Sequence, residues 1–368
     1  MDRVSKLLIE KITLKDFRNI AELSIEPAPR YNVVAGDNGQ GKTSLLEALY
    51  AVATSRSFRT ERPRELLRDG CEFARVDASI VEGPEQRTQR LTVSRAGRAV
   101  LYDGQRPESL SGYATRTPVI VFHPGDLELT MGGATRRRDL LDRVALFSDP
   151  AVADDRKRYR HALKERQTVL DQRGEHASEL SVYETLAARH GARLAQSRAN
   201  ATELLERDAA PGFRRLCAST LPFAMRYRPG GALDEATLEK EFANRRGQDR
   251  RRHAASFGPH RDDLELEIDG RPARKHASQG QHRILSLTLK LAELAAIRSA
   301  RGAHPVLLLD DVSSELDPTR TGAVYDFLRE SESQVFVTTT RPELFQTPGA
   351  GPLDRHDYRL ISGALEAT

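Results

Sequence analysis

A glycine-rich loop near the N-terminus constrains the fold of this chain more than any other segment. Residues 36–43 read GDNGQGKT and match the pattern G-x-x-x-x-G-K-[ST]. The apolar run 31–35 before the loop predicts a buried strand, and residues 44–53 after it predict a helix. A loop in this position aims backbone N–H groups at phosphate oxygens, and the helix N-terminus adds partial positive charge. The sequence therefore predicts an α/β domain with a site for a nucleoside triphosphate.

Two residues of this loop have individual roles. Lys42 is expected to reach the β- and γ-phosphates of ATP and to serve catalysis, and the Thr43 hydroxyl is expected to ligate Mg²⁺. The alternative is a glycine-rich turn that contains Lys-Thr by chance, which explains the flanking strand and helix less well. Kinases, GTPases, helicases and ABC-type ATPases share such a loop, so other motifs must select among them. The other residues expected here to line the nucleotide are Gly36, Asp37, Gly39, Gln40, Gly41 and Ser44.

A second motif ends another apolar run. Residues 305–311 read PVLLLDD, an apolar strand that ends in two carboxylates, as a Walker B element does. Asp310 is expected to hold the metal, and Asp311 is expected to position or deprotonate the attacking water. The alternative is a buried strand whose Asp pair only begins a turn. The glycine-rich loop in the same chain favours the catalytic interpretation.

The segment Ser278-Gln279-Gly280-Gln281 begins a predicted helix whose apolar residues follow 3–4 spacing. It fits the S-x-x-Q capping box, which would only stabilise the helix N-terminus. It also resembles the signature motif of ABC-type ATPases, in which Ser278 and the Gly280 backbone would face the γ-phosphate of a nucleotide on a second copy. Asp317, in an SELD segment, resembles the D-loop of the same proteins.

The order of these motifs along the chain supports the signature interpretation. The loop is followed by the signature, the Walker B strand, the D-loop and a strand ending at residues 338–340, where a switch residue is expected. A signature helix cannot reach the loop of its own chain in this architecture. The order therefore predicts a head-to-tail homodimer that holds ATP between two copies and separates on hydrolysis. Ser278 is accordingly a predicted catalytic residue.

The chain has 368 residues, more than one hydrophobic core usually serves. The first third predicts short strands, residues 135–207 predict charged helices, and strand signals return from residue 264. We therefore expect an α/β ATPase lobe made of residues 1–127 and 258–368. A mainly helical lobe of residues 128–257 would be inserted into it.

Basic residues cluster locally although the total charge is balanced. Formal net charge is +4, from 57 basic and 53 acidic residues, which does not by itself identify a nucleic-acid binder. The clusters lie in residues 136–143, 156–166 and 245–252. The alternative to DNA contact is that these runs are solvated helix faces. The candidates for contacts with DNA phosphates are Arg136, Arg137, Arg138, Arg250, Arg251 and Arg252.

Two absences narrow the class of protein. No apolar stretch approaches the roughly 18 residues that span a membrane, and the first residues show no long apolar segment, so a cytoplasmic protein is expected. The two cysteines, Cys71 and Cys217, form no CxxC pair, and no His cluster has metal-ligand spacing. Neither a disulfide framework nor a zinc site is predicted.

Taken together, the motifs resemble the RecF family of bacterial recombination mediators, which are SMC-like ABC ATPases. The helical insert is too short for a long coiled coil, as in that family. Two positions depart from the family pattern: Gly125, where an acid is common, and Ala134, where Pro is usual. The motifs that carry the resemblance are SQGQ at 278–281, FRN at 17–19, SFRT at 57–60, FHP at 122–124 and GPHRDD at 258–263.

The resemblance implies an SMC-like ABC head with a second helical lobe. It implies a weak ATPase that dimerises on DNA with ATP and Mg²⁺ and is released by slow hydrolysis. Its work would be the repair of gapped DNA, replication restart and support of the SOS response, with RecR and RecO as partners in loading RecA. It also implies that Arg18 and Asn38 approach the nucleotide.

Other functions remain open at this point. An SMC-type DNA-tethering head would need long heptad runs, whereas residues 156–207 offer at most a short helical hairpin. The nucleotide-binding subunit of an ABC transporter is disfavoured by the GPHRDD segment and the helical insert. A P-loop kinase is disfavoured by the SQGQ and SELD segments.

Overall fold

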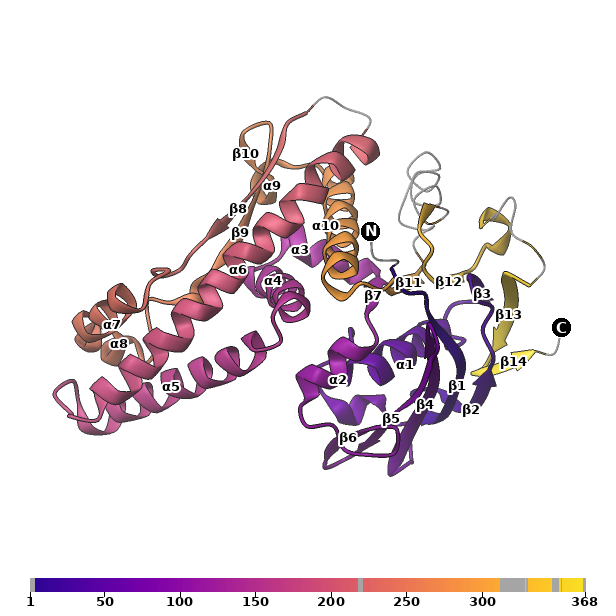
Figure 1. The fold of residues 1–368 in the computed structure, drawn as a ribbon, viewed down its shortest axis with the longest axis horizontal. Coiled ribbons are helices and arrows are strands. Elements are labelled where there is room, and N and C mark those ends of the chain that lie inside the picture. The colour runs from indigo at the N-terminus through magenta and orange to yellow at the C-terminus, as the bar shows by residue number, and fades with distance from the viewer. Residues whose placement is uncertain are drawn as a thin grey trace. The chain divides into compact units, whose positions relative to one another are not determined.

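The computed structural model describes residues 4–217, 221–311, 328, 330–345, 351 and 353–366. The chain divides into two compact units (Figure 1). The first unit consists of Met1–Asp126 and Ile297–Thr368, and the second unit consists of Leu127–Ala296.

The second unit is longer than the sequence predicted. Residues 258–296 were expected in the ATPase lobe, but they cluster with the second unit. The reason is sheet pairing, because β9 (Asp263–Ile268) pairs along its whole length with β8 (Phe223–Arg228). The division between the units falls within helix α10 (Gln279–Arg301).

A mostly parallel sheet organises the first unit. Its strand order is β14-β13-β3-β12-β11-β7, and the neighbours from β13 to β7 are parallel. Strands β7, β11 and β12 are buried at every position, which is typical of the short apolar runs that form parallel strands. The strands are β3 (Tyr31–Ala35), β7 (Val119–Phe122), β11 (Val306–Asp310), β12 (Val335–Thr339), β13 (Arg355–Ile361) and β14 (Ala364–Glu366).

An antiparallel sheet of order β2-β1-β4-β5-β6 completes the first unit. Helix α1 (Lys42–Thr54) contacts strands of both sheets and the short helix α2 (Leu110–Arg116). Eleven of the thirteen α1 residues are buried, which explains its almost continuous apolar sequence. One hydrophobic cluster runs through α1 and both sheets. The strands are β1 (Leu7–Phe17), β2 (Ile20–Ile25), β4 (Phe73–Glu82), β5 (Glu85–Ser94) and β6 (Gly97–Tyr102).

Strands β5 and β6 were not predicted from the sequence. The inward positions of β5 begin with Arg87 and Gln89 before Leu91 and Val93, so polar residues interrupt the apolar alternation. The Arg87 guanidinium pairs with Glu82 at 2.8 Å, and the Gln89 side chain accepts a hydrogen bond from Thr117. These partners satisfy part of the hydrogen-bonding capacity of the two side chains, while Arg87 Nε and Gln89 Nε2 have no hydrogen-bond partner among the described residues; sequence alone could not foresee these contacts.

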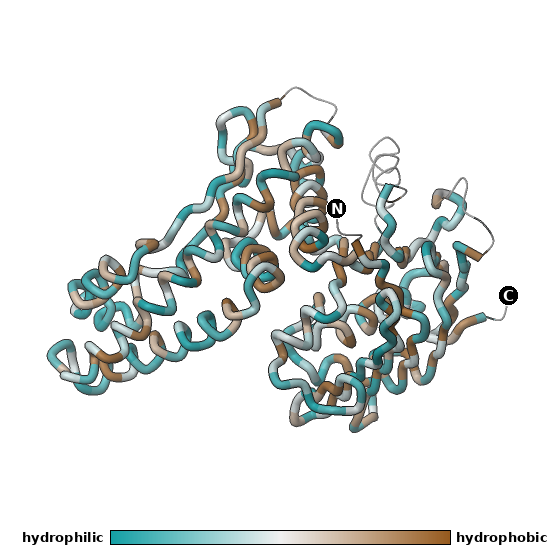
Figure 2. Tube along the Cα trace, viewed as in Figure 1, coloured by the Kyte–Doolittle hydropathy of each residue, from teal (hydrophilic) through white to brown (hydrophobic). Residues whose placement is uncertain are grey.

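The second unit is mainly helical and also contains the small antiparallel sheet β10-β9-β8. Helices α5 and α6 pack side by side as a hairpin (Figure 1). Helix α5 is hydrophilic along most of its length (Figure 2). The remaining elements are α3 (Glu128–Met131), α4 (Ala134–Ser148), α5 (Val152–Arg173), α6 (Leu180–Cys217), α7 (Glu235–Asn244), α8 (Arg246–Arg252), β10 (Arg271–Pro272) and α9 (Ala273–His276).

The GPHRDD segment is a structural anchor of the second unit. Asp262 is fully buried and accepts hydrogen bonds from Arg198, Tyr227 and the Gly230 N–H. The His260 ring bonds to the Tyr159 hydroxyl at 2.7 Å, and burial lowers the pKa of that histidine. The segment therefore ties the paired strands β8 and β9 to helices α5 and α6.

Candidate nucleotide-binding site

The glycine-rich loop lies at the carboxyl end of β3, where the sequence placed it. Helix α1 begins at Lys42, so the loop occupies the turn from strand to helix. Strand β12 pairs with β3 and β11 pairs with β12, all in parallel, so residues at their carboxyl ends reach the same sheet edge. Such an edge is where open parallel sheets bind ligands. Asp37, Asn38 and Gly39 are exposed at the rim of the loop.

The Lys42 ammonium is held across the loop. Its Nζ donates to the Gly36 carbonyl at 2.6 Å and to the Asp37 carbonyl at 2.8 Å. Burial lowers the pKa of Lys42, while the charges of Asp311, Asp310 and Asp37 act in the opposite direction. An ammonium has three donors, so this geometry leaves one for a phosphate oxygen.

Thr43 and Asp310, the two predicted metal ligands, lie within hydrogen-bond distance of each other. The Thr43 hydroxyl donates to Asp310 Oδ1 at 2.9 Å, and the Thr338 hydroxyl donates to the same oxygen at 2.8 Å. A hydroxyl and a carboxylate are hard oxygen ligands, which Mg²⁺ prefers beside phosphates and water. The donor set therefore fits a magnesium ion that arrives with a nucleotide.

Asp311 adopts an unusual backbone conformation at the end of β11. Its φ angle is +50°, in the left-handed region that Asp tolerates better than most residues. Its backbone N–H donates to the Thr338 carbonyl oxygen at 3.2 Å and to the Thr338 hydroxyl oxygen at 3.1 Å. Thr338 thus contacts the Asp310 carboxylate and the Asp311 backbone N–H, so the end of β12 bears on both predicted Walker B residues.

Arg18 was expected to approach the nucleotide, and in the structure its side chain binds Glu47. Its guanidinium donates two hydrogen bonds of 2.8 Å to Glu47 of α1, which is fully buried. Arg59 and Ser57 of the SFRT segment also bind Glu47. The sequence signal for this cluster was an acid within the apolar helix, because a buried carboxylate requires cationic or hydrogen-bonding partners.

Two segments outside the loop form hydrogen bonds that support it. Ser44 donates to Asn19 Oδ1 at 2.8 Å, and Asn19 Nδ2 donates to the Gly39 carbonyl at 3.3 Å. The Gln40 side chain accepts a hydrogen bond from the Ser362 N–H. Asn19 and Ser362 were not among the predicted site residues.

The SQGQ segment forms the capping box at the N-terminus of α10. The Gln281 N–H donates to Ser278 Oγ at 3.2 Å, and the Ser278 N–H donates to Gln281 Oε1 at 2.7 Å. Ser278 and Gln279 remain exposed. The Ser278 oxygen accepts in this cap, so its hydroxyl hydrogen can still point to another group. The two interpretations of the segment are therefore compatible. Asp317 lies outside the described residues.

The Arg136–Arg138 run does not act as one basic surface. Arg137 is buried, pairs with Asp263 at 2.7 Å, and donates to the carbonyls of Leu129 and Gly132. Its guanidinium is therefore not available to a DNA phosphate, which corrects the prediction for this residue. Arg138 is half-buried and donates to the Asp262 carbonyl, whereas Arg136 is exposed.

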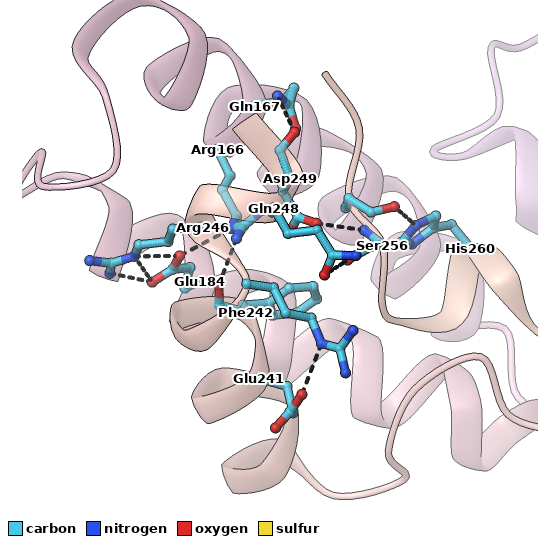
Figure 3. Close-up of polar contacts among 12 residues, drawn as sticks. Arg166, Gln167, Glu184, Glu241, Phe242, Arg246, Gln248, Asp249, Ser256 and His260 are labelled. Carbon is cyan, nitrogen blue, oxygen red and sulfur yellow. Dashed lines mark hydrogen bonds and ion pairs between the residues drawn. The ribbon is translucent and has the colours of Figure 1, made fainter. Parts of the chain in front are cut away.

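The second predicted basic cluster lies at the end of helix α8, which is anchored near its start (Figure 3). Arg246 pairs with Glu184, and Asp249 pairs at 2.9 Å with the buried Arg166. Arg250, Arg251 and Arg252 form the last turn and are exposed. A helix C-terminus favours cations, so this position also suits a merely solvated face.

Further exposed arginines gather on the first unit and were not predicted as a surface. Residues 56–68 contain five arginines, and the turn η1 (Pro63–Leu66) within them contacts β5 and β6. The pKa of Arg98 on β6 is lowered by partial burial of its guanidinium and, to a smaller extent, by the charge of Arg56. The exposed members are Arg56, Arg59, Arg62, Arg64, Arg68, Arg95 and Arg98. Arg59 pairs with Glu47, Arg62 with Glu65 and Arg68 with Asp16.

Comparison with known proteins finds similarity along nearly the whole chain. Residues 8–350 match the family model described as the RecF/RecN/SMC N terminal domain. The DNA replication and repair protein RecF of Anaeromyxobacter sp. (strain Fw109-5) is 40% identical over 365 residues, covering 96% of this chain and 97% of the relative.

Solved structures match the fold at similar coverage. A structure of the recombination mediator protein RecF with ATP, in the RecFOR pathway, has a TM-score of 0.86 at 26% identity, covering 98% of this chain and 97% of that chain. The Smc head domain from Pyrococcus furiosus, with an extended coiled coil and bound to the C-terminal domain of ScpA, has a TM-score of 0.56 at 16% identity. It covers 98% of this chain and 95% of that chain, and it shares the fold alone.

None of the helices in the described part of the chain combines the length and apolar character that crossing a bilayer requires.

The role of Arg137 can be tested by stability. Arg137→Leu would leave Asp263 and two backbone carbonyls without their partner, and should lower the free energy of unfolding by about 2–3 kcal/mol. The exposed neighbour serves as the matched control, since Arg136→Leu should change it by less than about 0.5 kcal/mol. Urea unfolding of the two variants measures the difference. Equal effects would show that Arg137 is not a structural arginine.

Proposed function

The chain belongs to the RecF family of DNA replication and repair proteins, and from this premise we propose that it is an ATP-dependent DNA clamp. It binds ATP, pairs head to tail with a second copy on DNA, and is released by slow hydrolysis. One observation carries the proposal: Lys42, Thr43 and the Asp310–Asp311 pair gather at one edge of the parallel sheet. Related RecF with ATP has been solved, which supports the nucleotide.

The residues at this edge have different roles toward ATP. Backbone N–H groups of the loop and the α1 N-terminus cradle the phosphates, and Lys42 binds the β- and γ-phosphates. Thr43 and Asp310 hold Mg²⁺, which when bound neutralises charge on the phosphates. Asp311 orients the attacking water and accepts its proton, and the Thr338 contacts fix the backbone from which it acts.

The signature segment completes the site of the partner copy. In the capping box, Gln281 and Ser278 satisfy each other, whereas the first N–H groups of a helix have no partner within it. Those of Gln279 and Gly280 form an anion site at the start of a 23-residue helix, and the Ser278 hydroxyl adds a donor. The γ-phosphate of the other copy's ATP is the proposed ligand, and Asp317 is proposed to lie beside it.

Exposed arginines supply the proposed contacts with DNA phosphates. Arg250–Arg252 project from an anchored helix, Arg136 is accessible on α4, and the surface around Arg56 and Arg98 adds cations on the first unit. Phosphate contacts fix position without reading sequence, which suits a clamp that acts at gaps in any sequence.

The wider role follows from the family. A related RecF acts in the RecFOR pathway, which supports RecR and RecO as partners in loading RecA at gaps. The same role includes replication restart and support of the SOS response, with the protein in the cytoplasm beside the chromosome.

Replacing the loop lysine tests whether ATP drives pairing. Lys42→Met keeps the apolar stem but removes the ammonium, so ATP should no longer convert the monomer into a dimer in sedimentation velocity. The exposed Lys157 gives a matched control, because Lys157→Met should retain the ATP-dependent shift. A normal shift in Lys42→Met would contradict the proposed role of the loop in assembly.

The water-positioning role of Asp311 predicts a separation of binding from turnover. Asp311→Asn retains the shape but not the basicity, so ATP hydrolysis should fall about 100-fold or more while ATP binding persists. Steady-state ATPase assays and equilibrium binding measure the two quantities. Wild-type turnover in this variant would remove Asp311 from the catalytic role.

The α8 arginines can be tested through the salt dependence of DNA binding. Changing Arg250, Arg251 and Arg252 together to Gln should weaken binding and reduce the slope of log affinity against log salt by up to about three. The control changes Arg226 and Arg228, which pair with Glu267 and Glu265 on the β8–β9 sheet, to Gln. An unchanged slope in the triple variant would identify the α8 arginines as a solvated face.

A further inference from the structure

The C-terminal hairpin of the first unit holds the glycine-rich loop. The turn between β13 and β14 contains Ser362 and Gly363. The Gly363 N–H donates to the Gln40 carbonyl at 2.9 Å, and the Ser362 N–H donates to the Gln40 side-chain oxygen at 2.5 Å. One loop residue therefore receives two hydrogen bonds from a turn more than 300 positions later.

The packing between the hairpin and the loop leaves no room for side chains at two glycines. A Cβ on Gly36 would lie 2.5 Å from the Leu360 carbonyl oxygen of β13. A Cβ on Gly363, whose φ angle is +80°, would lie 2.4 Å from the Asn19 carbonyl oxygen. Both contacts involve backbone atoms, which cannot swing aside. The first glycine of the loop is thus required by β13 as well as by the bend of the loop.

These contacts also set the direction of loop N–H groups. In a planar peptide unit, the carbonyl of one residue and the N–H of the next point in opposite directions. Asn19 holds the Gly39 carbonyl, and Gly363 holds the Gln40 carbonyl. The N–H groups of Gln40 and Gly41 are therefore turned away from Asn19 and the hairpin, in a direction that leaves them free to donate.

We propose that the β13–β14 turn and Asn19 form a collar that positions the glycine-rich loop for phosphate binding. Within this collar, Gln40 acts through its side chain on the turn, whereas only its backbone serves the nucleotide. This revises the expected role of Gln40 as a nucleotide ligand. The inference rests on the proposed ATP binding, and it makes the C-terminal hairpin a determinant of ATP affinity.

The experiment compares two glycines in hairpin turns of the first unit. Gly363→Ala places a methyl group against Asn19, whereas Gly83→Ala, in the β4–β5 turn at φ +58°, places one where nothing lies within 4 Å. Both substitutions strain a left-handed backbone, so both should lower the unfolding midpoint. In equilibrium titration of the full chain, Gly363→Ala should weaken ATP binding by about tenfold or more, and Gly83→Ala by less than about twofold.

A milder variant keeps the test independent of folding. Gln40→Met preserves side-chain length but removes the acceptor for Ser362, and should weaken ATP binding several-fold without the loss of stability that Gly363→Ala brings. If both Gly363→Ala and Gln40→Met bind ATP with wild-type affinity, the proposed role of the collar is wrong. Absence of ATP binding by the wild-type chain would instead overturn the proposed function, so the two failures are distinguishable.

Discussion

The hydrogen bond from Thr43 to Asp310 joins two segments that lie 267 positions apart, and the candidate site depends on it. It forms because β3, β12 and β11 are parallel neighbours, so the loop after β3 and the carboxylates after β11 emerge at the same edge. Helix α1 is buried between the two sheets and begins at Lys42, so its packing holds the end of the loop at this edge. The second unit, Leu127–Ala296, lies between these two segments in the sequence.

Buried ion pairs join the helices of the second unit to one another. Arg198 joins Asp142 to Asp262, and Arg166 joins Glu184 to Asp249, with each of these side chains nearly inaccessible. Removing one member of such a group leaves another charge buried without compensation, which costs more than the pair contributes. The networks therefore specify how α4, α5, α6 and α8 pack. They also distinguish the arginines that are buried in ion pairs from those that are exposed at the surface.

Motifs that bring their own local geometry could be predicted from the sequence. The strand, loop and helix around Lys42 and the apolar strand before Asp310 lie where their patterns placed them, because burial and phosphate-loop geometry leave few alternatives. Charge runs could not be resolved in this way. Arg136 and Arg137 are adjacent, yet one is exposed and the other is buried against Asp263, a partner 126 positions away. Strand β5 and the contacts of Gln40 with the hairpin were also missed, since both depend on partners remote in sequence.

The central claim is that ATP is held between the loop of one copy and the signature segment of another, and mixing two inactive variants tests it most directly. Lys42→Met disables the loop, and Ser278→Asp keeps a residue able to cap α10 while placing a carboxylate against the phosphate. Neither variant alone has a complete site, but a mixed pair has one site with an intact loop and an intact signature. The account predicts that the equimolar mixture hydrolyses ATP although neither variant does so alone. A mixture no more active than its separate components would contradict the shared site.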